Sequence, residues 1–484
     1  MSMVYAGLDI GTTGCKISLF EDLSALGTFY EAYASSRSAE KDEIDAREIL
    51  RSAKKVIQEA YAFRNDLTAI GVTSFGETFV LLDKEDNVLM PSILYSDPRG
   101  KAEAEELRST LGAEKIGQIT GLMVHEMFSL PKLLSIRKSH PEIWTQVDKV
   151  FLMQDYIVYS LTGVRQIDES LASRTMLFDC HKRKWSEELF FFTNLNPSLF
   201  STPVPTGTRA GKIRLDGVET GMDLYNVSHD QVAVAIGCGL KEESTLVDGC
   251  GTCECLIPFF HSVPNDPQIY DGGYGVVPYV VNQGYISYPL IFSGGALAQW
   301  FVTQFGPKGE DPYAYFDHQI DPNIPSKILL SPYFLGSGTP DMDSSAQGAI
   351  YGLNISTKPK DIYQACLEGV AYELRRNLDV LKSMGMNPQR ILATGGGSQN
   401  KKWLQIKANI LGLPVTSMKN KDAGTIGSAI VVGTSIGLFS SLEEGMERLV
   451  QHGETFAPNL ETKIRYDALY KNYLKMVKGQ KELK

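Results

Sequence analysis

The residues best suited to chemistry lie in a glycine- and threonine-rich turn near the start of the chain. An apolar run that ends at Asp9 is followed by Gly11-Thr12-Thr13-Gly14 and by a second strand-like run that carries Lys16. Two strands joined by such a turn predict a β-hairpin. Its backbone N–H groups and hydroxyls form a nest for phosphate oxygens, Asp9 can hold a divalent cation, and Lys16 adds positive charge. An ordinary tight hairpin fits this pattern equally well.

A second copy of the turn favours the phosphate interpretation. Residues 245–257 contain a strand-like run with Asp248, a turn with Gly249, Gly251 and Thr252, and another strand-like run. Two related hairpins in opposite halves of the chain suggest duplicated domains that face one nucleotide. We therefore expect domains of residues 1–243 and 244–484.

Three cysteines in the second turn, Cys250, Cys253 and Cys255, resemble part of a metal cluster. No second pair follows at zinc-finger spacing and the segment has the pattern of a strand, so we do not predict a metal there. The chain has seven cysteines, an odd number without a disulfide framework, which is typical of reduced thiols in a cytoplasm.

Polar residues also gather where a short buried strand, residues 69–73, is predicted to end. The strand runs into Ser74-Phe75-Gly76-Glu77-Thr78, and such positions commonly line a ligand crevice in α/β folds. Glu77 is alternatively a solvated loop carboxylate. Asp97 and Arg99 form either a surface ion pair or a set of acceptors and donors for a polyhydroxylated ligand.

Asp230 precedes a run of small residues, V-A-V-A-I-G-C-G, that predicts a closely packed helix. A carboxylate at a helix N-terminus is stabilised by the helix dipole. Asp230 is therefore either a helix cap or a catalytic carboxylate, and its position alone favours the cap.

The hydrophobic pattern predicts the elements around these residues. Helices are expected at 44–63, capped by Asp45, at 361–384 and at 464–484, and helical pattern at 101–161 is broken by Gly121 and Pro131. A strand at 391–394 runs into Gly395-Gly396-Gly397, an arrangement that lets a ligand lie against bare backbone at a helix start.

Size and composition limit the function classes. A chain of 484 residues is too long for one core, and 43% hydrophobic with 21% charged residues is typical of a globular protein. The net charge of −10 argues against nucleic acid or an anionic membrane as partner, but not against ATP. The sequence shows neither a signal peptide nor a membrane-spanning run, so we expect a cytoplasmic protein.

Together these segments resemble the FGGY family of carbohydrate kinases, in the actin-like ATPase superfamily, in order and over nearly the whole chain. D-I-G-T-T-G-C-K and D-G-C-G-T-C are similar to its phosphate motifs, T-G-G-G-S-Q-N-K-K-W-L to its adenosine motif, and P-Y-F-L-G-S-G-T-P-D-M-D to its signature. The resemblance implies an α/β fold with two actin-like, ribonuclease H-like domains around a central cleft. It also implies transfer of the γ-phosphate of ATP, with Mg²⁺, to a hydroxyl of a sugar or polyol.

The resemblance further assigns roles to individual residues. Asp230 corresponds to the catalytic base, which reverses the preference for a helix cap, and Asp9 would hold the metal. The implied nucleotide-binding residues are Thr12, Thr13, Lys16, Thr252, Gly295, Gln299, Gly395, Gly396, Gly397 and Asn400. The implied sugar-binding residues are Phe75, Gly76, Glu77, Asp97, Arg99, Asp230 and Gln231. A nest, a metal and one carboxylate are sufficient, because phosphoryl transfer demands mainly positioning and charge neutralisation.

The substrate is less specified. Glu77-Thr78 and Asp230-Gln231 resemble pairs in glycerol kinases, but those enzymes place an arginine where this chain has Gly76 and an aromatic residue where it has Met127. Xylulokinases carry Q-M-H-G where this chain has S-F-G-E. V-T-S-F-G and S-H-D-Q are more similar to the fuculokinase and rhamnulokinase branch. We therefore expect a ketose such as xylulose, a deoxy-ketose or a polyol.

Two other classes of protein remain as alternatives. A catalytically idle relative would bind sugar and nucleotide as a regulator, but Asp9, Lys16, Asp230 and Thr252 are all retained. An actin-like chaperone or filament protein would share the hairpins without a substrate pocket. The sequence leaves the oligomeric state open, and a homodimer is compatible with it.

Overall fold

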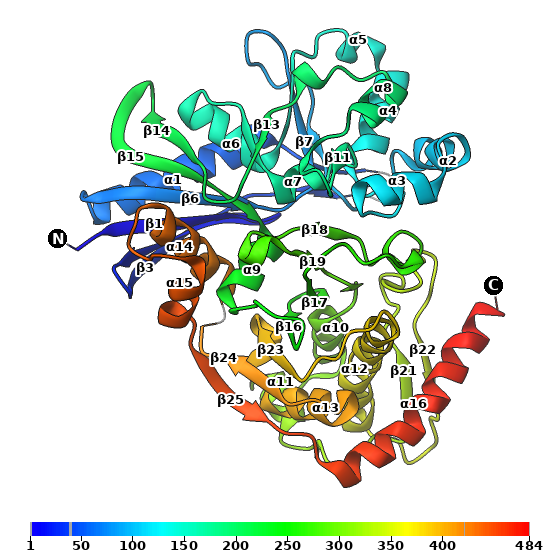
Figure 1. Ribbon diagram of the computed structural model, residues 1–484. Helices are drawn as coiled ribbons and strands as arrows, with labels where there is room; N and C mark the ends of the chain where they lie inside the picture. Colours follow the sequence, from blue (N-terminus) through cyan, green and yellow to red (C-terminus); the bar gives the residue numbers. More distant parts are fainter. Residues whose placement is uncertain (1, 38–40, 421, 484) are drawn as a thin grey trace.

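A computed structural model describes residues 2–37, 41–420 and 422–483. The chain forms two α/β halves, each built on a mixed sheet (Figure 1). The first sheet contains, in spatial order, β14 (Arg209–Leu215), β15 (Val218–His229), β6 (Leu67–Ser74), β1 (Val4–Ile10), β2 (Gly14–Glu21) and β3 (Ser24–Ala32). The second contains β18 (Val276–Pro278), β19 (Tyr285–Ser287), β17 (Glu254–Phe260), β16 (Thr245–Cys250), β23 (Arg390–Thr394), β24 (Val415–Met418) and β25 (His452–Phe456), with β20 (Leu290–Ile291) paired to β17.

The two sheets share one topology. In the first, β1 pairs antiparallel with β2 and parallel with β6, and β6 pairs parallel with β15. In the second, β16 pairs antiparallel with β17 and parallel with β23, and β23 pairs parallel with β24. Each half thus begins with a glycine-turn hairpin, and the repeated order confirms the predicted pair of actin-like, ribonuclease H-like units.

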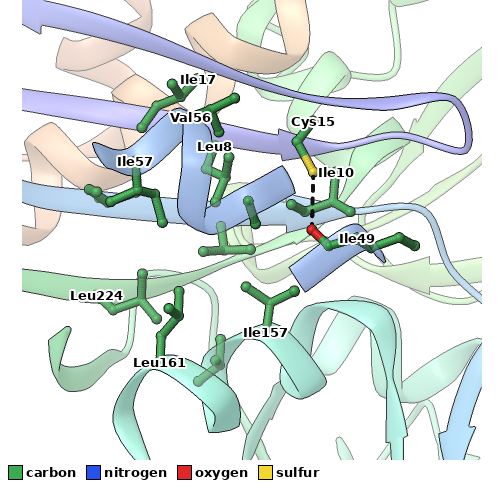
Figure 2. Packing of buried hydrophobic residues seen from close by; sticks show 14 of the residues in the cluster. Leu8, Ile10, Cys15, Ile17, Ile49, Val56, Ile57, Ile157, Leu161 and Leu224 are labelled. Carbon is green, nitrogen blue, oxygen red and sulfur yellow. Dashed lines mark hydrogen bonds between the residues drawn. The ribbon is translucent and has the colours of Figure 1, made fainter. Parts of the chain in front are cut away.

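Two helices cover one face of the first sheet, α1 (Ala46–Phe63) and α6 (Met153–Thr162) (Figure 1). The side chain of Asp45 accepts a hydrogen bond from the N–H of Arg47, which confirms the predicted start of α1. Figure 2 shows buried Leu8 and Ile17 of the sheet beside Val56 of α1, and Leu224 of the sheet beside Leu161 of α6. This core packs α1 and α6 against the sheet that carries the first hairpin.

The segment at 101–161 departs from the prediction. Its elements are α2 (Lys101–Thr110), α3 (Ala113–Thr120), α4 (Ser129–Ser139), α5 (Pro141–Trp144) and β9 (Lys149–Leu152), followed by α6. Gly121 ends α3 with a φ of 70°, as expected. Pro131 does not break a helix, because it lies in the first turn of α4, where a backbone N–H has no helical partner. The unpredicted strand β9 pairs with β7 (Phe79–Leu82).

The described part of the second half contains six α-helices besides α14 (Ala423–Ser435). These are α10 (Gly295–Phe305), α11 (Pro312–Asp317), α12 (Pro359–Ser383), α13 (Lys401–Leu411), α15 (Leu442–Leu449) and α16 (Leu460–Lys481). The predicted helices at 361–384 and 464–484 correspond to α12 and α16.

Shorter elements of both halves are β4 (Ser36–Arg37), β5 (Asp42–Ile44), β8 (Ser92–Ile93), β10 (Gln166–Asp168), α7 (Glu169–Ser173), β11 (Phe178–Asp179), β12 (Lys184–Trp185), α8 (Glu187–Thr193), β13 (Thr202–Val204), β21 (Leu329–Ser331) and β22 (Ala349–Tyr351). Within the described ranges, no helix combines the length and the apolar character needed to cross a bilayer.

The halves meet where α9 (Asp230–Gly237) crosses α14 (Ala423–Ser435). A Cβ atom added to Gly237 would lie 1.8 Å from the carbonyl oxygen of Ala423, and one added to Gly427 would lie 1.9 Å from that of Ala233. α14 also packs against β1, where a Cβ on Gly7 would lie 2.7 Å from Cβ of Ser428 (Figure 1). The small residues of α9 therefore allow the close helix packing that the sequence predicted.

We expect Gly427→Ala to lower the free energy of unfolding by about 1–3 kcal/mol, because the added methyl group would have to push two backbones apart. Urea denaturation measures this change. Gly479→Ala in α16 is the matched control, since a Cβ there meets no atom within 4 Å and alanine favours a helix. A Gly427 variant as stable as the Gly479 variant would contradict the importance of this contact.

Candidate functional site

A cavity of about 440 Å³ lies between the two halves. Nine of the predicted site residues line it: Asp9, Lys16, Phe75, Gly76, Glu77, Asp230, Gln231, Thr252 and Gly395. Residues from both hairpins therefore face one cavity together with Asp230. The other predicted residues lie outside its lining: Thr12, Thr13, Asp97, Arg99, Gly295, Gln299, Gly396, Gly397 and Asn400.

Asp9 and Lys16 stand opposite each other on the strands of the first hairpin. Burial raises the pKa of Asp9 to about 6, the charge of Lys16 opposes this rise, and the charges of Asp230 and Asp422 add to it. No described residue donates a hydrogen bond to the Asp9 carboxylate. Nζ of Lys16 lies 2.9 Å from Oδ1 of Asp422, which precedes α14. A carboxylate among like charges and without a donor is suited to a divalent cation.

The two hairpin turns are closed in similar ways. The N–H of Gly11 donates to the carbonyl of Gly14 at 3.0 Å, and the N–H of Gly251 donates to the carbonyl of Cys253 at 3.1 Å. Gly295, the first residue of α10, donates its N–H to the carbonyl of Gly251 at 2.9 Å. A Cβ on Gly295 would lie 2.6 Å from that oxygen, so glycine is required for α10 to start against the turn.

The segment after β23 contributes one residue to the lining of the cavity and a cap to the helix that follows. Gly395, with a φ of 87°, turns the chain at the end of the strand and lines the cavity. Asn400 caps α13: its Oδ1 accepts from the N–H of Trp403 at 3.0 Å, and its Nδ2 donates to Asp317 at 3.1 Å. Gln299 is exposed on α10.

Asp97 and Arg99 form an ion pair outside the cavity. Nε of Arg99 donates to Oδ1 of Asp97 at 2.8 Å and Nη2 donates to Oδ2 at 2.6 Å, while Glu43 lies 2.7 Å from the same nitrogen. Asp97 is buried and also accepts from the N–H of Asp42. Of the two alternatives, the ion pair is present, but it is not a surface pair.

Asp230 is the first residue of α9 and does not cap the helix. The cap is His229, whose Nδ1 accepts from the N–H of Gln231 at 3.2 Å. Oδ1 of Asp230 accepts from the same N–H at 2.6 Å and lies 3.0 Å from Nδ1 of His229. No hydrogen bond from a described residue reaches Oδ2. Asp230 therefore keeps one carboxylate oxygen for a ligand.

Glu77 is held in an uncommon conformation. Its φ is 62°, in the left-handed region that non-glycine residues rarely adopt. The side chain is buried and forms an ion pair with Arg174, and Oγ of Ser129 donates to the backbone carbonyl of Glu77 at 2.6 Å. The alternative of a solvated loop carboxylate was therefore wrong.

Several residues of the lining were not predicted. They include Phe128, Arg174, His229, Tyr288 and Asp422. Arg174 carried a signal that could have been used, because it is the only charge in the apolar stretch L-A-S-R-T-M-L-F, and such a charge needs a buried partner. Tyr288 carried no such sequence signal. It lies in the second half, in the connection between β19 and β20, and only the fold brings it to the cavity.

Behind the second hairpin, Lys407 of α13 lies in a cluster with Asp248, Cys250 and Glu254. Its Nζ is 2.7 Å from Oδ2 of Asp248 and 3.1 Å from Sγ of Cys250, and it also contacts Oε1 of Glu254. The side chains of Lys407, Asp248 and Glu254 are fully buried. The geometry of Asp248, Cys250 and Glu254 resembles a metal site, but the ammonium group takes the place of the cation. Lys407 thus ties the hairpin to α13, the helix in which the predicted adenosine motif ends.

Comparison with known proteins decides the family. The profile of the FGGY family of carbohydrate kinases, N-terminal domain, matches residues 4–237, and that of the C-terminal domain matches residues 250–436. The chain belongs to the FGGY family of carbohydrate kinases. It is a sugar kinase, and ATP is the phosphoryl donor that the family implies.

Individual relatives of this kinase have low sequence identity to it, but the matches extend over nearly the whole of both chains. The xylulose kinase of Staphylococcus xylosus is 27% identical over 485 residues, covering 96% of this chain and 98% of the relative. Two solved structures from Lactobacillus acidophilus, described as a ligand-bound xylulose kinase and as a gluconate kinase, each show 21% identity and a TM-score of 0.91, covering 99% of this chain and 98% of theirs. These structures support the fold alone.

We expect Lys407→Met to destabilise the kinase by about 3–5 kcal/mol, because two buried carboxylates would lose their cation. Burial and the charge of Asp248 already raise the pKa of Glu254 well above its usual value. Without Lys407 the folded state would bind more protons than the unfolded state, so the deficit should grow from about pH 5 to about pH 8.

Urea denaturation at both pH values measures this dependence. The variant Lys407→Met with Asp248→Asn and Glu254→Gln is the control, because it removes the charges together and should lose the pH dependence. Equal deficits of Lys407→Met at the two pH values would contradict the assignment of an internal cation.

Proposed function

We propose that this kinase transfers the γ-phosphate of Mg·ATP to a hydroxyl of a neutral ketose, such as xylulose, with Asp230 as the general base. The observation that carries the proposal is the single cavity lined by both hairpins and by Asp230. Asp9 and Lys16 approach it from the first half and Thr252 from the second. A phosphate held between the hairpins would meet a sugar held beside Asp230.

The residues support a simple division of labour. Oδ2 of Asp230 is free to accept the proton of the attacking hydroxyl, because only Oδ1 accepts a hydrogen bond from a described residue. Lys16 would exchange Asp422 for phosphate oxygens, and the N–H groups of the turns would add donors. Asp9 would hold a magnesium ion, which neutralises phosphate charge when bound.

The charge of the cavity bears on the substrate. Among the described residues of its lining there are four carboxylates, Asp9, Glu77, Asp230 and Asp422, and two permanent cations, Lys16 and Arg174. An excess of negative charge disfavours a sugar acid such as gluconate and favours a neutral sugar.

The space beside Gly76 argues against glycerol as the substrate. A Cβ on Gly76 would lie 2.7 Å from Cδ2 of His229 and 3.2 Å from Cγ of Arg174. The arginine that glycerol kinases place at this position would therefore have no room. Together with the names of the relatives, this favours a ketose.

The direct test is ADP release from ATP and Mg²⁺ over a panel of ketopentoses, deoxy-ketoses, polyols and aldonates. We expect stimulation by a neutral ketose, little by an aldonate, and loss of turnover when EDTA removes the metal. Slow hydrolysis that ignores every sugar would favour the chaperone-like alternative. Sugar and nucleotide binding without turnover would favour the idle regulator.

We expect Asp230→Asn to lower kcat by about 10²–10⁴-fold while ADP affinity stays unchanged, because the amide cannot accept the proton. Steady-state kinetics and calorimetry measure the two quantities. Asp45→Asn is the matched control: it makes the same change at the start of α1, away from the cavity, where asparagine caps equally well. Near-wild-type turnover of the Asp230 variant would remove this residue from the mechanism.

A further inference from the structure

We propose that Arg174 binds the sugar directly and, together with Glu77, determines which hydroxyl pattern this kinase accepts. The inference rests on the proposed function, because it requires the sugar to lie beside Asp230. It concerns a residue that neither hairpin contains and that the sequence motifs did not indicate.

Arg174 and Glu77 form a buried ion pair in which each side chain keeps one polar atom without a hydrogen-bond partner among the described residues. Arg174 and Glu77 are only 4% and 5% exposed, yet both line the cavity. Nε of Arg174 donates to Oε1 of Glu77, and Nη2 contacts the same oxygen. Within the described part of the chain, no residue accepts a hydrogen bond from Nη1 and none donates one to Oε2. Neither atom is among the described polar side-chain atoms that are enclosed without a hydrogen-bond partner. Since both residues line the cavity, we infer that a ligand there can reach these two atoms.

These two atoms present a donor beside an acceptor. A sugar hydroxyl can accept a hydrogen bond from Nη1 and donate one to Oε2 at the same time. Both partners are charged, which strengthens such bonds. A substrate with a bare carbon at this place would leave two buried charged groups without partners, and sites of this kind reject the deoxy analogue strongly.

The second observation is that the guanidinium is held between aromatic rings from both halves. It lies 4.7 Å from the ring centre of Phe128 and 4.8 Å from that of Tyr288. Tyr288 stacks in turn on His229, with ring centres 5.2 Å apart and an interplanar angle of 12°. His229 precedes Asp230, so Tyr288 is a positioning residue that links the guanidinium to the catalytic carboxylate. A planar guanidinium fixed in this way points its free donor in one direction.

The third observation is the strained backbone at Glu77. A left-handed conformation at a buried glutamate has a cost, and it persists here because Ser129 and Arg174 hold the residue at both ends. Gly76 leaves no space for a side chain beside His229 and Arg174. The local structure therefore aims the Glu77 carboxylate at the guanidinium and into the cavity.

The experiment compares wild type, Arg174→Met and Arg174→Lys on the preferred sugar and on a series of analogues that each lack one hydroxyl. We expect wild type to reject one analogue by at least about 100-fold in kcat/KM. The quantity compared is the ratio of kcat/KM for the preferred sugar to kcat/KM for each analogue. Arg174→Met should reduce this ratio for the rejected analogue to about 10-fold or less and leave the ratios for the other analogues unchanged. Arg174→Lys should keep part of the discrimination, because lysine keeps the charge but not the fixed fork.

Arg183→Met is the matched control. Arg183 also pairs with a glutamate, Glu169 at 3.2 Å, and lies over a tyrosine ring, that of Tyr285 at 5.2 Å, but it does not line the cavity. This variant should keep every ratio. ADP binding and thermal melting show whether each variant is folded, and Tyr288→Leu, which should weaken the same single ratio, tests the inference even if Arg174→Met does not fold.

A purely structural role of Arg174 would lower kcat/KM for all analogues by the same factor, and that result would overturn the inference. Wild-type discrimination in Arg174→Met would overturn it as well. In either case the wild-type enzyme would still release ADP in response to sugar, so the proposed function would stand. Absence of any sugar response in wild type would instead remove the proposed function and this inference together.

Discussion

The contact between α9 and α14 is the constraint on which the site depends. These helices approach so closely that their backbones touch at Gly237 and Gly427, where a single methyl group on either residue would overlap a carbonyl oxygen. α9 begins with Asp230, and α14 begins next to Asp422, the partner of Lys16. Because the contact is made by backbone and not by flexible side chains, it fixes the position of Asp230 relative to α14 and to the first hairpin, against which α14 packs.

Buried cations then fix the segments that the backbone alone would not hold. Lys407 neutralises carboxylates behind the second hairpin, and Arg174 holds Glu77 in a left-handed conformation in front of the first sheet. Burying such charges is costly unless each finds an opposite charge and hydrogen bonds. Both clusters meet this condition with partners from distant parts of the chain, which makes the local conformation of each segment depend on the whole fold.

Much of the fold could be predicted because short sequence patterns specify its elements. The glycine turns at residues 11–14 and 249–252 marked both hairpins, Asp45 marked the start of α1, and the small-residue run after Asp230 indicated that α9 is closely packed. The prediction failed where local signals were ambiguous. Strand β9 lies within helical pattern, and Pro131 sits in the one turn of a helix that tolerates it.

The sequence by itself determined the family, the duplicated hairpins and the residue types for phosphoryl transfer, because these depend on neighbours within a few positions. Only the tertiary structure decided which charges meet: Lys16 with Asp422, 406 residues apart, Asp248 with Lys407, 159 apart, and Glu77 with Arg174, 97 apart. It also separated Asp97 and Arg99 from the cavity and brought Tyr288 into it. The physical reason is that an ion pair depends on distance in space, and no local pattern specifies which of many charged side chains will share one buried volume.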